Sequence, residues 1–404
     1  MPLSFLPTLP LPASPLVLFG VLLIAGHIGG ELVYRITSLP RITGYVLVGM
    51  LLGASGLKLL TPELTRIANV FVDIALGLVL FELGRRLDFK WLRHDPWLLV
   101  TGLVESALSF GFVFFALVYL GVDPVYAAAA AAIGVATSPA IVLLVTRELG
   151  AEGQITERTL ALTAINSVIS FVMVTMMLSW IHSQYRANWY TVFLHPVYLL
   201  LGSVALGFVA NHIAKVLARW LRKHERHHFM LLLGLIIITV GCATVFKLSV
   251  VLALLAFGVM VRNLDERHDL MAVDMSQVEE MFFVVLFVVG GANLHVSDLL
   301  AGSVLAAAFI IARFVGKSLG VLTLTWFSGV RRRHAALLCM GLVPMSGFAV
   351  TMMQSAMAEH PEFGSKLGSI VLAAVVVLEL IGPLMIQFAL RRAGESGVEL
   401  PDGR

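Results

Sequence analysis

Apolar runs of about 18 to 25 residues recur from Leu16 to the end of the chain, and this repetition limits the possible folds more than any other feature. Each run is long enough to cross the ~30 Å hydrocarbon core of a bilayer as a helix. Within lipid, only helices or a closed barrel satisfy every backbone polar group, and continuous apolar runs favour helices. Charged residues make up 13% of the chain, against roughly 25% in soluble domains. The sequence therefore predicts an all-α, polytopic membrane protein.

About thirteen transmembrane helices are expected, followed by a short tail. The predicted spans cover residues 16–34, 42–60, 67–87, 97–121, 125–146, 159–181, 191–216, 229–246, 248–261, 278–293, 299–327, 335–357 and 367–390. The division at Lys247 is the weakest, because the apolar run hardly pauses there. Residues 1–392 are expected to form one membrane domain, and 393–404 a cytoplasmic tail.

The basic residues indicate how the chain is oriented. With these spans, 21 lysines and arginines fall in the loops on one side and 5 on the other. Cytoplasmic loops carry the excess of basic residues, so the N-terminus is predicted outside and the C-terminus in the cytoplasm. A multi-pass protein of the plasma membrane, the inner membrane of a bacterium, is expected. The basic clusters are topology signals, so no nucleic-acid partner is predicted.

Two cations do not fit this loop pattern. Arg313 and Lys317 lie near the middle of the span 299–327, one helical turn apart on one face. A cation at bilayer depth is costly and faces a polar interior or a partner. Two interpretations stay open: a structural ion pair between helices, or a charge-balancing role in a transport site.

Two predicted helices carry a proline near their midpoint. Residues 134–140 read GVATSPA and residues 341–347 read GLVPMSG. Pro139 and Pro344 each remove a backbone donor, so both helices should unwind there, the second one near Gly347. An ordinary proline kink is the alternative. Unwound backbone at membrane depth is tolerated only where it is buried in protein or lines a cavity.

The positions of these two helices suggest a repeat. Each is the fifth of a six-helix block if 191–216 stands alone between two blocks. Because a single span, an odd number, lies between the two blocks, the blocks would be inverted, as in many secondary transporters. The sequence thus predicts two inverted six-helix repeats whose broken helices cross.

An ordered set of motifs is similar to a known family. The motifs are residues 39–45 (LPRITGY), 49–53 (GMLLG), 80–84 (LFELG), 137–139 (TSP), 313–317 (RFVGK) and 344–347 (PMSG). Together they resemble the monovalent cation/proton antiporter superfamily, particularly its second branch. The resemblance implies a core domain with crossed broken helices, a dimerisation domain against which it moves, and a homodimer. It implies exchange of Na⁺ or K⁺ for protons, with no cofactor.

The chain departs from the family where the exchange chemistry usually lies. The resemblance places the usual helix-6 pair, which ends in an aspartate, at Asn166 and Ser167. In the first branch the broken helix reads Thr-Asp-Pro, and Ser138 stands at that aspartate. Thr137, Ser138, Asn166 and Ser167 become candidate cation ligands. Their neutral oxygens can coordinate a hard cation, but they cannot shuttle a proton at ordinary pH.

Another intramembrane acid should supply proton coupling, and Glu82 and Glu379 are the two candidates. Glu82 lies where some relatives carry a binding-site glutamate, or it pairs with Arg86 one turn away. Glu379 lies in an apolar run and is expected to pair with Arg313 or Lys317. Glu105 and Asp73 are further intramembrane acids and weaker candidates.

The favoured function is a secondary transporter that exchanges a monovalent cation for protons. The alternatives are a sensor or regulatory relative that has lost transport, and an uncoupled cation pathway, since the usual aspartate is replaced by Ser167. An enzyme is not expected, because no nucleophile–base set and no metal-ligand pattern occurs at membrane depth.

Overall fold

The computed structural model describes residues 14–185, 189–221, 225–265, 270, 273–294, 303–324, 326–345, 347, 349–350, 352–353 and 366–397, and the fold is all-α. The helices before the chain midpoint are α1 (Pro15–Thr37), α2 (Arg41–Leu52), α3 (Pro62–Arg85), α4 (Phe89–His94), α5 (Pro96–Tyr119), α6 (Pro124–Gly134), α7 (Pro139–Glu148) and α8 (Gln154–Tyr185). The later helices are α9 (Trp189–Trp220), α10 (Glu225–Val245), α11 (Val250–Leu264), α12 (Ser276–Ala292), α14 (Ser303–Leu324), α15 (Arg332–Gly341) and α17 (Lys366–Ala393).

Within this described part, nine helices are long and apolar enough to cross a membrane, with α6 and α7 taken as one span. The helices α2 and α11 are apolar but shorter. Many large hydrophobic side chains are exposed on the outer surface of the described helices, for example Leu16, Ile24 and Phe115. Such an apolar outer surface is what a lipid environment requires.

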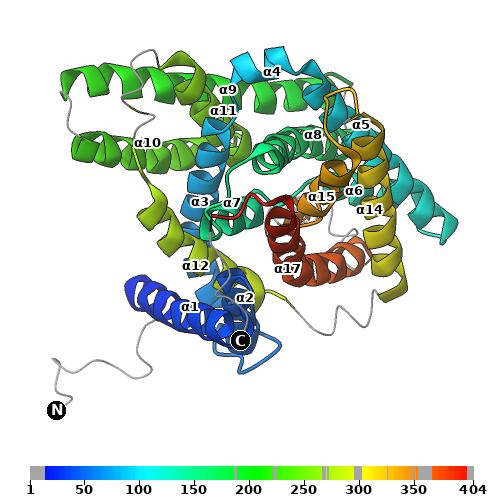
Figure 1. Cartoon of the computed structure of the whole chain (residues 1–404), viewed down its shortest axis with the longest axis horizontal. Helices are drawn as coiled ribbons and strands as arrows, with labels where there is room; N and C mark the ends of the chain where they lie inside the picture. Colours follow the sequence, from blue (N-terminus) through cyan, green and yellow to red (C-terminus); the bar gives the residue numbers. More distant parts are fainter. Residues whose placement is uncertain are drawn as a thin grey trace.

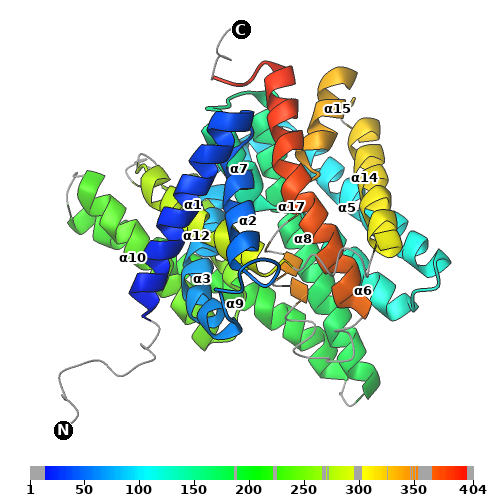
Figure 2. The ribbon, with the colours of Figure 1, turned by 90° about the horizontal axis from the view of Figure 1, so that it is seen from below.

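The helices gather in two groups. The helices α5, α6, α8, α14, α15 and α17 lie together on one side of the molecule, and α10 lies on the far side from α14 (Figure 1). The view turned by 90° shows the same grouping, with α14, α15 and α17 beside α5 and α8 (Figure 2). Between the groups, α12 packs along α2 and α3, and α17 packs on α7.

One helix boundary differs from the sequence prediction, and one uncertain boundary is confirmed. The second helix ends at Leu52 rather than near residue 60, and its C-cap, Gly53, lies against the end of α12. A Cβ atom at Gly53 would lie 2.3 Å from the carbonyl oxygen of Ala292. The predicted break at Lys247 is present: this residue has a left-handed backbone (φ 52°) between α10 and α11.

Candidate functional site

Two unwound segments meet inside the bundle. α6 ends at Gly134 and α7 begins at Pro139, so the residues between them lie outside regular helix. α15 ends at Gly341, and residues 342–345 are not helical either. The backbone N–H of Ser138 donates to the carbonyl oxygen of Pro344 at 3.0 Å. Both interruptions therefore lie where the prolines predicted them, and they touch.

Local chemistry explains why α7 restarts at Pro139. The Ser138 side chain accepts a hydrogen bond from the backbone N–H of Ile141 at 3.3 Å and so caps the helix. A proline at the first helical position costs little, because its missing N–H would be unpaired there in any case. In the second segment, Gly347 is helical again, whereas Ser346 lies outside the described residues.

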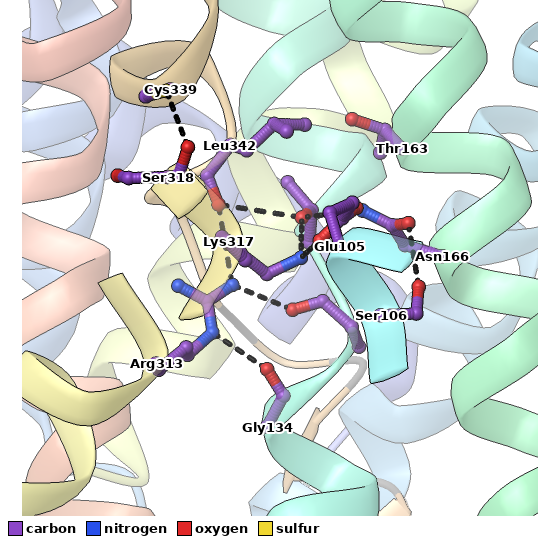
Figure 3. Close-up of polar contacts among 12 residues, drawn as sticks. Glu105, Ser106, Gly134, Thr163, Asn166, Arg313, Lys317, Ser318, Cys339 and Leu342 are labelled. Atoms are coloured by element: carbon purple, nitrogen blue, oxygen red, sulfur yellow. Dashed lines mark hydrogen bonds and ion pairs between the residues drawn. The ribbon is translucent and has the colours of Figure 1, made fainter. Parts of the chain in front are cut away.

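Arg313 on α14 binds the carbonyl oxygens that the unwound segments expose. Its guanidinium donates to five of them: Gly134 (2.7 Å), Ala136 (2.7 Å), Val343 (2.7 Å), Leu342 (3.3 Å) and Pro344 (3.4 Å). The residue is 1% exposed. A planar group with five N–H donors suits this arrangement, since carbonyls released from helices need donors. Arg313 thus holds the two segments together (Figure 3).

Lys317, one turn further along α14, forms a buried ion pair. Its Nζ atom lies 3.1 Å from Oε2 of Glu105 on α5 and 3.2 Å from Oγ1 of Thr137 in the first unwound segment. Glu105 is 0% exposed and Lys317 1%. The cation therefore has a carboxylate partner from another helix, as expected of a charge at this depth.

This partner corrects the sequence prediction. Glu379 was the expected partner of Arg313 or Lys317, but in the described part of the chain the only carboxylate paired with either cation is Glu105. Glu105 was considered only as a weak candidate. The packing of α14 against α5 brings Glu105 to Lys317.

Two glycines on α14 allow this packing. A Cβ at Gly320 would lie 2.4 Å from the Cα of Glu105, and a Cβ at Gly316 would lie 2.7 Å from the carbonyl oxygen of Leu108. Small residues four apart let membrane helices approach closely. Gly316 and Gly320 flank Lys317, so the contact that joins the helices also joins the ion pair. This spacing is a sequence signal for a close helix contact on the face of α14 near Lys317, although it does not say which helix packs there.

Asn166 on α8 extends the polar group. Its Nδ2 atom donates to Oγ1 of Thr137 at 3.3 Å, and its Oδ1 atom accepts from the hydroxyl of Ser106 at 3.2 Å. The Thr137 hydroxyl in turn donates to the carbonyl oxygen of Leu342 at 3.4 Å. Figure 3 shows Glu105 beside the Lys317 ammonium, with Asn166 and its partner Ser106 on the far side of Glu105. Of the four proposed cation ligands, Thr137 and Asn166 lie at this pair.

The other two proposed ligands are turned to the backbone. The hydroxyl of Ser167 donates to the carbonyl oxygen of Thr163 on its own helix at 2.8 Å. That of Ser138 caps α7. Both residues are buried, but their oxygens take part in helix-local bonds rather than in the Lys317 group.

Two buried oxygens beside the pair have no hydrogen-bond partner in the described structure. One is Oε1 of Glu105 and the other is the hydroxyl of Ser109, one turn along the same helix. Buried polar atoms are normally hydrogen-bonded, so these two oxygens can each accept a further bond. Oxygens of this kind suit a hard alkali or alkaline-earth cation.

Glu82 lies in a separate ion-pair cluster that joins α3, α7 and α12. It pairs with Arg85 at 2.9 Å, Arg147 at 3.4 Å and Arg86 at 3.5 Å. Arg147 also contacts Glu279. The pair with Arg86 is the alternative that sequence spacing suggested. Glu82 thus contacts neither Arg313 nor Lys317 in the described contacts.

Glu379 is buried on α17 and makes no ion pair or hydrogen bond within the described part of the chain. It lines a cavity with Asn69, Gly290, Asn293 and Gly347. No group of three or more His, Cys, Asp or Glu side chains that could hold a metal ion occurs among the residues that the structure describes.

Comparison of the sequence with known proteins identifies the family of the chain. The profile of the family described as "Sodium/hydrogen exchanger, transmembrane" matches residues 19–392, nearly the whole chain. The chain belongs to the sodium/hydrogen exchanger family. The expected membership of the antiporter superfamily is thereby confirmed. Sodium/hydrogen exchangers are multi-pass membrane transporters and not enzymes, as the sequence predicted.

Individual members of this family are similar over most of the chain. The high-affinity Na⁺/H⁺ antiporter NhaS3 of Synechocystis sp. is 26% identical over 357 residues, which cover 75% of this chain and 76% of that protein. Two structures of the sodium proton antiporter MjNhaP1 from Methanocaldococcus jannaschii share the fold. The structure at pH 8 has a TM-score of 0.65 at 17% identity and covers 93% of this chain and 95% of its own. The electron-microscopy structure has a TM-score of 0.71 at 14% identity and covers 95% and 99%.

Proposed function

We propose that this member of the sodium/hydrogen exchanger family exchanges Na⁺ or K⁺ for protons at the Lys317–Glu105 pair. The observation that carries the proposal is this buried ion pair, set against Thr137 in the unwound segment. The family's usual helix-6 aspartate is absent, and Glu105 supplies a carboxylate at the crossing of the broken helices. Na⁺ is favoured over K⁺ because the Synechocystis relative is named as a Na⁺/H⁺ antiporter.

Competition at Glu105 provides the coupling in this account. Without a bound cation, the Lys317 ammonium neutralises the carboxylate. A cation that binds Glu105 brings a second positive charge into a water-poor site, where like charges repel strongly. Lys317 then gives up one proton, and the net charge of the site is unchanged. Cation and ammonium proton exclude each other, so one flux drives the other.

The cation ligands would come from oxygens already present. Oε1 of Glu105 and the hydroxyl of Ser109 lack partners in the described structure. Thr137 contacts the ammonium, and Asn166 is hydrogen-bonded to Thr137. Arg313 would keep the unwound carbonyls in place while Lys317 changes its charge. Ser138 and Ser167 would support the segment rather than bind the ion. Glu82 and Glu379 remain the rival coupling residues.

The finer architecture is part of the same proposal. The order of helices supports thirteen spans, with α6–α7 and the helix begun by α15 as the broken members of two inverted repeats around α9. We expect an elevator-like movement of the group that holds α5, α6, α8, α14, α15 and α17 against the other group. A homodimer in the plasma membrane, with its N-terminus outside and its C-terminus in the cytoplasm, completes this account.

Proton flux in proteoliposomes tests the function. Purified protein is reconstituted, and a lumenal pH dye reports flux after addition of Na⁺, K⁺ or Li⁺, with Ser167→Asp as a second sample. Cation-dependent proton flux from the wild type supports exchange and identifies the cation. Flux from Ser167→Asp alone would favour a sensor that has lost transport. Cation movement without any pH change would favour an uncoupled pathway.

A further inference from the structure

A second polar site lies away from the Lys317–Glu105 pair. A cavity of about 70 Å³ lies between α3, α12 and α17, and its polar lining includes Asn69, Asn293 and Glu379. Asn69 is exposed and Glu379 is 2% exposed. The cavity thus runs from an accessible amide on α3 to a buried carboxylate on α17.

Glu379 differs from the other buried carboxylates of the membrane helices. Glu105 is paired with Lys317, and Glu82 and Glu279 are paired with arginines. Among the residues that the structure describes, no cation and no hydrogen-bond donor contacts the Glu379 side chain. A buried carboxylate that stays charged needs a counter-charge, and none of the described side chains supplies one here.

The backbone hydrogen bonding of α17 is also interrupted at Glu379. Pro383 lies inside α17 and has no N–H to donate to the residue four positions earlier, which is Glu379. The carbonyl oxygen of Glu379 therefore lacks its usual helical donor. Glu379 thus provides a carboxylate and a carbonyl oxygen that receives no hydrogen bond from the residue four positions later.

The end of α12 also favours a cation. Asn293, the C-cap of α12, and Gly290 in its last turn both line the cavity. The C-terminal end of a helix carries a partial negative charge that attracts cations. Gly290 leaves room beside the carboxylate, because a Cβ there would lie 3.3 Å from Oε1 of Glu379.

We propose that Glu379 forms a second alkali-cation site, separate from the Lys317–Glu105 pair. All of its candidate ligands are oxygens, which suits Na⁺ or K⁺ rather than a transition metal. The site is close to the second unwound segment, because a Cβ at Gly382 would lie 2.9 Å from the Cα of Pro344. It would hold the cation between the mouth at Asn69 and the crossing of the broken helices. Binding at Glu379 requires no exchange at Glu105, so the two proposals can fail separately.

Equilibrium binding of ²²Na⁺ to the purified full-length protein tests the site. The samples are the wild type, Glu379→Gln, Glu105→Gln and, as a matched control, Glu63→Gln, an exposed carboxylate at the start of α3. We expect Glu379→Gln to lower the Na⁺ affinity of one class of binding sites about tenfold or more, which corresponds to a loss of ~1.4 kcal/mol in binding free energy. Glu105→Gln should still bind Na⁺ at the sites assigned to Glu379, even if it no longer exchanges cations for protons. Glu63→Gln should bind Na⁺ like the wild type. Binding by Glu379→Gln equal to the wild type in amount and affinity would overturn the proposal.

Two further measurements keep the test decisive if Glu379→Gln folds poorly. Pro383→Ala restores the backbone donor and keeps the carboxylate, so it should weaken the same class of sites. Tl⁺, a heavy substitute for alkali cations, should give density in the cavity beside Glu379 in a wild-type structure. Unchanged Na⁺ binding in Pro383→Ala would show that the carbonyl oxygen of Glu379 is not a ligand of the site. A cavity without Tl⁺ density at saturating concentration would overturn the site itself.

Discussion

The Nζ atom of Lys317 lies 3.1 Å from Oε2 of Glu105 and joins α14 to α5 in the middle of the bundle. The same nitrogen lies 3.2 Å from Oγ1 of Thr137, so the pair also contacts the unwound segment between α6 and α7. One buried charge pair therefore links the packing of two long helices to the broken helix. The first two predictions depend on this link.

Removing only the lysine should destabilise the protein. Lys317→Met leaves the Glu105 carboxylate buried without its cation, which costs about 3 to 5 kcal/mol. The double variant Glu105→Gln/Lys317→Met removes both charges and should recover most of that loss. Thermal unfolding of the detergent-solubilised protein measures both. A double variant no more stable than Lys317→Met would show that the pair is not coupled as described.

The close approach of α14 and α5 can be tested at Gly320. A methyl group there would lie 2.4 Å from the Cα of Glu105, so Gly320→Ala must push the helices apart. We expect a loss of about 1 to 3 kcal/mol in stability and slower exchange. Gly111→Ala is the matched control, since a Cβ at Gly111 on α5 meets nothing within 4 Å. Equal effects of the two substitutions on exchange would contradict the packing argument.

Arg313 should not be replaceable by lysine. Its guanidinium satisfies five carbonyl oxygens of the two unwound segments, whereas an ammonium has three donors on one nitrogen. Arg313→Lys should lose about 2 kcal/mol or more of stability, because buried carbonyls stay unpaired. Arg35→Lys, in an exposed pair with Glu31, should have little effect. Thermal unfolding of Arg313→Lys within experimental error of the wild type would argue against this role.

Two hydroxyl deletions separate ligands from helix-local groups. Thr137→Ala removes an oxygen that contacts both Lys317 and Asn166, so exchange should slow about tenfold or more. Ser167→Ala removes a hydroxyl that bonds the carbonyl oxygen of Thr163, so exchange should change little. Initial rates of dye-reported proton flux compare them. If Ser167→Ala slows exchange as much as Thr137→Ala does, Ser167 would have to be counted among the cation ligands.

Local features of the sequence predicted much of this arrangement. The apolar runs indicated the membrane helices, because a segment that crosses lipid must satisfy its own backbone hydrogen bonds, which a helix does. Pro139 and Pro344 marked the two interruptions, since proline acts on its own helix. The break at Lys247 and the pair between Glu82 and Arg86 could also be read from neighbouring residues.

Contacts between distant segments could not be predicted in this way. Glu105 and Lys317 are 212 residues apart in the chain, and the residues around each of them do not predict the other as its partner. Glu379 was expected to pair with a cation of α14, but it faces a cavity with α3 and α12 instead. Its partner-free position follows from how three helices pack, which hydropathy and spacing do not reveal.

The central claim is that Glu105, and not Glu82 or Glu379, couples the cation to the proton. Na⁺- or K⁺-driven proton flux in proteoliposomes of Glu105→Gln tests it most directly, with Glu82→Gln and Glu379→Gln reconstituted at equal density. We predict that Glu105→Gln folds, as judged by size-exclusion chromatography, but loses cation-dependent proton flux. Glu82→Gln should keep exchange at reduced thermal stability, because its arginines lose their shared partner. Robust exchange by Glu105→Gln, with loss of flux in Glu82→Gln or Glu379→Gln, would contradict the account.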